Sequence, residues 1–244
     1  MEEYETYAVF TPTSVASVNY IERTSLNSRM VSALRTPGKQ LIIFGHSGVG
    51  KSSLLRNSLI KLYDTEVVTN CMTGMSFDAV ILDVFDQLNE YYVNAMNHVD
   101  TTNIKASIES SYFDIKALIE TSTSASDTTG TVRIVPIQLT PQRLADFLGK
   151  ANSCWVLEDF HKMDEPEKIK LSQIMKIFMD KAVDYKNLKI VALGAVNSGR
   201  EVVKYDEEMK NRIAEIEVQL MPEKELEKIL INGENFLNIK FNNV

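Results

Sequence analysis

The residues Gly45-His46-Ser47-Gly48-Val49-Gly50-Lys51-Ser52 decide the fold of this chain. They match the pattern G-x-x-x-x-G-K-[ST], which is typical of phosphate-binding P-loops. The preceding run, Gln40-Leu41-Ile42-Ile43-Phe44, is apolar and rich in β-branched and aromatic residues, so it predicts a buried parallel strand. The residues from Ser52 to Leu62 carry apolar side chains at helical spacing and predict a helix. We therefore expect a strand, a glycine-rich loop and a helix in succession.

The residue types of this loop point to an oligophosphate ligand. Gly45, Gly48 and Gly50 allow backbone conformations and a close approach that side chains would block. The loop N–H groups and the positive end of the helix can then surround phosphate groups. We expect Lys51 to contact the β- and γ-phosphates of a nucleotide and the Ser52 hydroxyl to ligate Mg²⁺. The other residues expected to line the site are His46, Ser47, Val49 and Ser53.

Composition and charge narrow the classes of function. The 244 residues are 44% hydrophobic and 24% charged, as in a soluble globular α/β domain with some additional structure. A net charge of −7 argues against a generally basic nucleic-acid surface, although a local basic patch stays open. We expect no membrane span, because no apolar run reaches about 18 residues. The acidic N-terminus, and Cys71 and Cys154 in apolar runs as core residues, favour a cytoplasmic location.

A second motif, which is acidic, follows about 100 residues after the loop. The run Cys154-Trp155-Val156-Leu157 predicts a buried strand that ends in Glu158 and Asp159. By position, Glu158 is expected to hold Mg²⁺ and Asp159 to act as the base that activates water. Asp before Glu is the usual order in P-loop ATPases, and the shorter Asp159 reaches less far, so slow turnover is expected. The alternative is a strand that ends in two solvated acids.

Further elements are predicted from periodicity and from turn residues. Helices are predicted at residues 21–34, 77–93, 104–120, 141–150, 165–183 and 221–230. Strands are predicted at residues 66–71, 187–194 and 215–220, with an edge strand at 132–137 because it contains proline. Residues 121–130 are polar and of low complexity, so a loop is expected there. The region of about 94–140 is interpreted as an insertion between core strands.

Three residues outside the two motifs are candidate nucleotide contacts. Tyr20 and Ile21 precede a helix that leads into the P-loop strand, so they could contact an adenine base or serve as core anchors. Asn197 follows the predicted strand 187–194, and its polar side chain is expected near the γ-phosphate, with Ser198 as the second choice.

The ordered set of motifs at residues 45–52, 154–161 and 194–230 resembles the AAA+ superfamily. The resemblance is to its bacterial branch adjoining the STAND signalling ATPases and the origin-recognition-type ATPases, and it extends over residues 15–232. It implies a P-loop NTPase three-layer α/β/α sandwich with a parallel sheet of strand order 5-1-4-3-2. By the same resemblance, Asn197 is at the sensor position and Arg212 is at the position of an arginine finger that reaches a neighbouring subunit's γ-phosphate. The alternative for Arg212 is an ordinary surface arginine.

The resemblance also implies a division of the chain and a function. Residues 1–36 would form an N-terminal segment and helix, 37–221 the ATPase core, and 222–244 the start of a helical lid that is truncated or reduced. The implied function is Mg²⁺-dependent ATP binding and slow hydrolysis, with ATP or ADP bound and nucleotide state controlling self-association or an effector protein. Bacterial defence is one setting for such a switch. Two alternatives stay open, a non-hydrolysing nucleotide-dependent scaffold and a DNA-associated loader.

Overall fold

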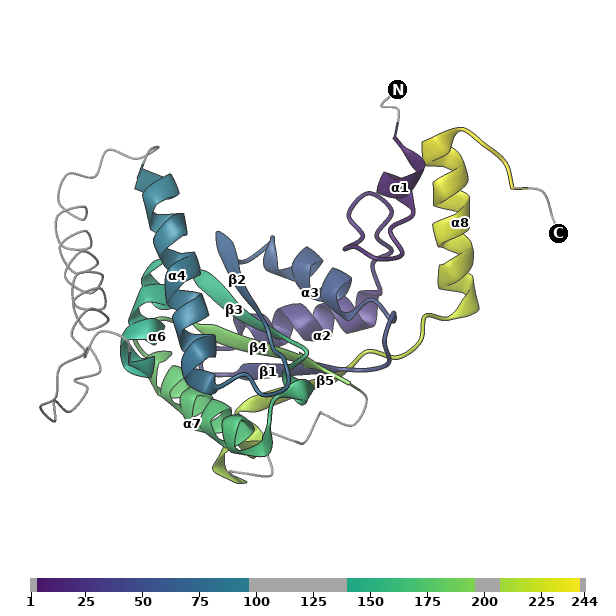
Figure 1. Ribbon diagram of the computed structural model, residues 1–244. Helices are drawn as coiled ribbons and strands as arrows, with labels where there is room; N and C mark the ends of the chain where they lie inside the picture. The colour runs from purple at the N-terminus through teal and green to yellow at the C-terminus, as the bar shows by residue number, and fades with distance from the viewer. Residues whose placement is uncertain (1–3, 97–139, 196–206, 242–244) are drawn as a thin grey trace, which may run out of the picture.

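The computed structural model describes residues 4–96, 140–195 and 207–241. Its centre is a sheet of five parallel strands in the order β2-β3-β4-β1-β5 (Figure 1). The strands are β1 (Gln40–Phe44), β2 (Thr65–Asn70), β3 (Ser153–Glu158), β4 (Lys189–Gly194) and β5 (Ile213–Glu217). Read from the other edge, this is the order 5-1-4-3-2, so the predicted P-loop NTPase fold is confirmed.

Helices cover both faces of the sheet and make it a three-layer structure (Figure 1). The helices on one face are α2 (Thr24–Arg35) and α3 (Lys51–Leu59), and those on the other are α4 (Phe77–Met96), α6 (Pro141–Lys150) and α7 (Glu165–Lys181). Alternate residues of β3 enter the two cores: Trp155 packs on the α4, α6 and α7 side, whereas Cys154 packs on the α2 and α3 side. A strand buried on both faces explains why its sequence is continuously apolar.

The only tryptophan lies at the centre of the larger core. Trp155 has no exposed surface, and its ring centroid lies 6.3 Å from that of Phe77 and 6.0 Å from that of Phe178. Both cysteines are buried free thiols, as predicted, and burial raises the pKa of Cys71 to about 12. Thiols in this state are packing residues, because the reactive form of cysteine is the thiolate.

Some predicted boundaries are wrong. The helix predicted from residue 21 begins at Thr24, because the Asn27 carbonyl accepts hydrogen bonds from the Arg23 N–H at 2.9 Å and the Tyr20 hydroxyl at 3.2 Å. These side-chain bonds hold residues 20–23 outside the helix. The strand predicted at 215–220 is β5, which ends at Glu217. The predictions at 104–120, 121–130 and 132–137 lie outside the described residues.

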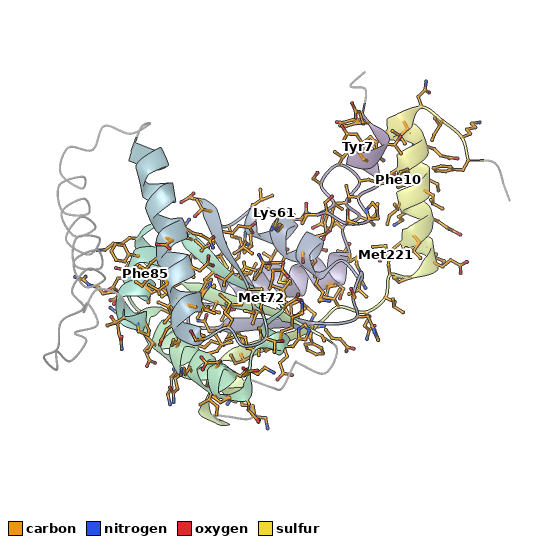
Figure 2. All side chains as sticks on the ribbon, viewed as in Figure 1. Tyr7, Phe10, Lys61, Met72, Phe85 and Met221 are labelled. Atoms are coloured by element: carbon orange, nitrogen blue, oxygen red, sulfur yellow. The ribbon has the colours of Figure 1, made fainter. Side chains whose placement is uncertain are left out.

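The N-terminal segment lies along the last helix, α8 (Glu223–Leu237), with the short helix α1 (Thr6–Val9) beside it (Figure 1). Arg23 pairs with Glu225 at 3.4 Å near the start of α8. Further along α8, Phe10 packs against the helix (Figure 2), and its ring occupies the space that a Cβ on Gly233 would need. The division of the chain into parts at residues 36 and 222 stays a prediction. In the structure, the N-terminal part packs on α8, which belongs to the C-terminal part. In the described part of the chain, no helix is both long enough and apolar enough to cross a bilayer.

Candidate phosphate-binding site

The loop between β1 and α3 depends on its glycines. Gly48 and Gly50 have φ values of 77° and 85°, in the left-handed region that other residues rarely adopt. Gly50 is also the N-cap of α3. At Gly45 a Cβ would collide with the carbonyl oxygen of Val218, the residue that follows β5. The loop therefore wraps the N-terminus of α3 and lies close to the chain that leaves the sheet.

The Lys51 ammonium group is folded over this loop. Its Nζ donates hydrogen bonds to the carbonyl oxygens of Gly45 at 3.0 Å and His46 at 2.7 Å. Burial lowers the pKa of Lys51, whereas the nearby carboxylates of Asp159 and Glu158 oppose that shift. A cation that is partly removed from water and bonded to carbonyl oxygens gains from an anionic ligand, because hydrogen bonds between two charged groups are stronger than those to neutral ones.

Ser52 and Glu158 are brought into direct contact. The Ser52 hydroxyl donates a hydrogen bond of 2.9 Å to Glu158 Oε1, although the residues are 106 positions apart. These are the two residues predicted to hold Mg²⁺. Among the described residues no group of three or more His, Cys, Asp and Glu side chains could hold a metal ion. One or two protein oxygens completed by phosphate oxygens are the usual ligand set of Mg²⁺ in nucleotide sites, and this pair fits that set.

Asp159 directly follows β3, and its carboxylate has a different partner from that of Glu158. Its backbone is left-handed, with φ of 56°, a conformation that Asp tolerates better than most residues. Its carboxylate pairs with Lys162 Nζ at 2.6 Å, and the side chain is 51% exposed. The predicted role as a base for water is untested by this geometry, and it requires Lys162 to release the carboxylate.

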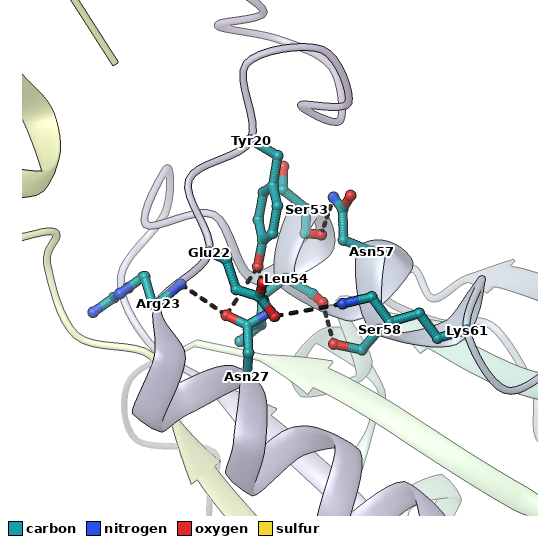
Figure 3. A network of polar contacts seen from close by, with 9 residues as sticks. All are labelled: Tyr20, Glu22, Arg23, Asn27, Ser53, Leu54, Asn57, Ser58 and Lys61. Carbon is teal, nitrogen blue, oxygen red and sulfur yellow. Dashed lines mark hydrogen bonds and ion pairs between the residues drawn. The ribbon is translucent and has the colours of Figure 1, made fainter. Parts of the chain in front are cut away.

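The segment before α2 crosses the start of α3 (Figure 3). The Ala16 N–H donates to the Ser53 hydroxyl at 3.1 Å, and Asn57 Nδ2 donates to the Ala16 carbonyl at 2.9 Å. Tyr20 is oriented by Asn27, whose amide donates to the phenol oxygen at 2.8 Å, and burial raises the pKa of Tyr20 (Figure 3). Sequence reasoning missed Ala16 and Asn57, because a backbone anchor carries no residue signature.

Both predicted adenine contacts therefore lie on a segment that is fixed to the P-loop helix. Tyr20 and Ile21 are both partly buried there. Their contact with a base stays a prediction. Asn197, the predicted γ-phosphate contact, lies outside the described residues, as does Ser198.

Arg212 lies at the opposite end of the sheet from the P-loop. Its carbonyl accepts from the Gln40 N–H at 2.9 Å at the start of β1, and its guanidinium pairs with Asp180 at 3.1 Å. The length of β1, about 13 Å at 3.3 Å per residue, separates that position from the loop. Arg212 is thus placed away from the phosphate loop of its own chain, and only a role toward a second chain stays a prediction for it.

A cavity of about 610 Å³ lies at this same end of the sheet. Its lining includes Pro37, Lys39, Asp180, Lys186 and Arg212. We assign the functional site by the chemistry of the P-loop and not by the volume of this cavity, because glycine N–H groups, a lysine and a serine–carboxylate pair converge only at the loop among the described residues.

Comparisons with known proteins agree with the fold. No protein-family profile matches the sequence, and no curated protein matches it. Among solved structures, the chain is similar to a Walker-type ATPase of Pyrococcus abyssi, with 13% identity and a TM-score of 0.54 over 91% of this chain and 60% of that one. It is also similar to Cdc6p of Pyrobaculum aerophilum, with 15% identity and a TM-score of 0.52 over 94% of this chain and 53% of that one. The chain thus spans 60% and 53% of the lengths of these proteins, and it has the P-loop NTPase fold.

Proposed function

We propose that this chain binds ATP and ADP with Mg²⁺, hydrolyses ATP slowly, and acts as a nucleotide-controlled switch. The observation that carries the proposal is the Ser52–Glu158 hydrogen bond at the mouth of the glycine loop. It joins a hydroxyl and a carboxylate that are suited to one metal ion beside a loop that is suited to phosphate.

Binding would use the loop and the groups beside it. The N-terminus of α3 and the left-handed glycines support this role, because such a helix start offers backbone N–H groups to a phosphate. Lys51 would exchange its bonds to Gly45 and His46 for bonds to the β- and γ-phosphates. When bound, Mg²⁺ would neutralise charge on the β- and γ-oxygens, with Ser52 and Glu158 as its protein ligands.

In addition to the groups that bind the nucleotide, hydrolysis requires a base that activates water and a cation that stabilises the charge of the transition state. Asp159 is our candidate base, and its pairing with Lys162 supports a slow reaction, because the carboxylate must first leave that ammonium group. Arg212 would supply positive charge to a site on a neighbouring chain, and Asn197 would contact the γ-phosphate. Self-association is therefore part of the proposal.

The switch would operate through the segment before α2, which contacts both α3 and α8. Ala16 is bonded to Ser53 in the first turn of α3, and the following residues pack on α8. Gain or loss of the γ-phosphate beside Ser52 can therefore change the position of this segment and of α8. An exposed α8 could then bind a second chain or an effector protein, with bacterial defence as one setting.

The decisive experiment is ATP turnover by the purified chain with Mg²⁺ over a wide range of protein concentration. We expect slow turnover, with a specific activity that rises with concentration. ATP binding without turnover at any concentration would replace hydrolysis with the scaffold function. Absence of ATP binding would overturn the proposal as a whole.

A further inference from the structure

The side chain of Asn19 has an unused hydrogen-bond acceptor. It is 4% exposed, its Nδ2 donates to the Ile229 carbonyl of α8 at 2.9 Å, and its Oδ1 has no hydrogen-bond partner. The bond to Ile229 fixes the orientation of the amide group, and with it the position of the carbonyl oxygen. Buried polar atoms in proteins are nearly always paired, because an unpaired one loses its hydration without compensation.

Asn19 lies on a segment that is anchored on either side of it to chain next to the phosphate loop. Before it, the Ala16 N–H donates a hydrogen bond to the Ser53 hydroxyl in the first turn of α3. After it, Arg23 Nη1 donates to the Gln219 carbonyl at 2.9 Å, one residue beyond the Val218 carbonyl that faces Gly45. Asn19 is three residues from Ala16, a span of at most about 11 Å in an extended chain. This span keeps Asn19 close to the N-terminus of α3, where the proposed nucleotide would place its phosphates.

We infer that Asn19 Oδ1 recognises adenine by accepting a hydrogen bond from the exocyclic amine of the base. This inference rests on the proposed nucleotide binding and adds the residue that selects the base. Adenine presents an amine donor at its 6-position, whereas guanine and hypoxanthine present a carbonyl acceptor there. Opposite an acceptor that is held in place by Ile229, only the amine forms a hydrogen bond. A 6-oxo purine would set two acceptors against each other.

The test compares ADP, with an amine at the 6-position and a bare N1, and IDP, with a carbonyl at the 6-position and an N1–H, by titration calorimetry on the wild-type chain and on Asn19→Leu. We expect the wild-type chain to bind ADP at least about tenfold more tightly than IDP. In Asn19→Leu, ADP should lose that advantage, and the two nucleotides should bind with similar affinity. Asn57→Leu is the matched control, because it removes an amide that holds the same segment at Ala16 without removing the acceptor. Its ADP-to-IDP ratio should remain that of the wild-type chain.

A second measurement needs no variant and covers the case in which Asn19→Leu does not fold. The diphosphate of purine riboside has hydrogen at the 6-position, so it lacks both the amine and the opposing carbonyl. The wild-type chain should bind it at least about fivefold more weakly than ADP. Equal wild-type affinity for ADP and IDP, or an unchanged ratio in Asn19→Leu, would overturn the role of Asn19 and leave nucleotide binding intact. Failure to bind any of these nucleotides would overturn the proposed function itself.

Discussion

The Ser52 hydroxyl donates a 2.9 Å hydrogen bond to Glu158 Oε1 across the carboxyl ends of the strands. Ser52 lies in the first turn of α3, which follows β1, and Glu158 is the last residue of β3. In the sheet, β4 lies between β1 and β3. The bond therefore spans the end of β4. Ligands of open α/β sheets bind outside the carboxyl ends of the strands, which is where this pair lies.

Replacing Lys51 should remove nucleotide binding. Lys51→Ala leaves the loop without its cation, and we expect ATP affinity to fall by about 100-fold or more because charge-assisted bonds to two phosphates are lost. Titration calorimetry measures this. Lys61→Ala is the control, because Lys61 only pairs with Glu22 in an exposed contact. Retained ATP affinity in Lys51→Ala would disprove the phosphate assignment.

Replacing Glu158 should remove the Mg²⁺ dependence of binding. Glu158→Gln keeps the shape and a hydrogen-bond acceptor for Ser52 but lacks the negative charge that a metal ion requires. We expect ATP affinity with Mg²⁺ to fall to the level measured with EDTA, whereas the affinity in EDTA stays close to that of the wild-type chain. If added Mg²⁺ still tightens binding to the same degree, Glu158 is not a metal ligand.

Replacing Asp159 should separate binding from turnover. Asp159→Asn cannot accept a proton from water, so we expect the rate of phosphate release to fall by about 100-fold or more with ATP affinity retained. Lys162→Ala is the companion variant, since it frees the carboxylate from its 2.6 Å ion pair and should not lower the rate. Unchanged turnover in Asp159→Asn would assign the base to another residue.

Arg212 and Asp180 form a pair that tests the role of a second chain. Arg212→Ala should lower the maximal turnover by about a thousandfold and abolish its rise with protein concentration. Asp180→Ala breaks the same ion pair but keeps the guanidinium, so activity should persist. Both side chains are more than half exposed, at 54% and 67%, so neither change should alter stability by more than about 1 kcal/mol. Equal losses in both variants would indicate a structural role.

Lys189 predicts a dependence of stability on pH. It is fully buried, its Nζ donates to the Thr36 carbonyl at 2.6 Å, and burial lowers its pKa to about 8. Between this pKa and the ordinary lysine value, the unfolded chain binds more protons, so the contribution of Lys189 to stability rises with pH. Between pH 8 and pH 9.5, this effect should raise the free energy of unfolding by on the order of 2 kcal/mol. Denaturant titrations should show this gain relative to Lys189→Met, and parallel pH profiles of the two proteins would contradict it.

Much of the fold follows from local patterns in the sequence. The apolar runs at β1, β3 and β4 mark strands that are buried on both faces, and the G-x-x-x-x-G-K-[ST] pattern fixes the turn from β1 to α3. Thr140 and Pro141 predicted the start of α6 correctly, and the Thr140 hydroxyl accepts a hydrogen bond from the Arg143 N–H there. Such signals are readable because the physical cause lies within a few residues of the effect.

Other features have causes that lie far away along the chain. The start of α2 was predicted three residues too early, because the side chain of Asn27 competes for the residues before it. The Oδ1 atom of Asn19 is a fixed acceptor only because the amide nitrogen of the same side chain donates to Ile229 of α8, which lies 210 residues later. Nothing in the sequence near residue 19 indicates this contact.

The sequence alone predicted the chemistry at the loop, since the roles expected of Lys51 and Ser52 follow from their positions in the G-x-x-x-x-G-K-[ST] pattern. It also determined the strand order through resemblance. Only the tertiary structure decided which distant groups meet. It joins Ser52 to Glu158, ties Asp159 to Lys162, places Arg212 at the far end of the sheet and leaves the Asn19 carbonyl without a partner. The physical reason is that side-chain pairing depends on how elements cross and pack, and periodicity carries no information about that crossing.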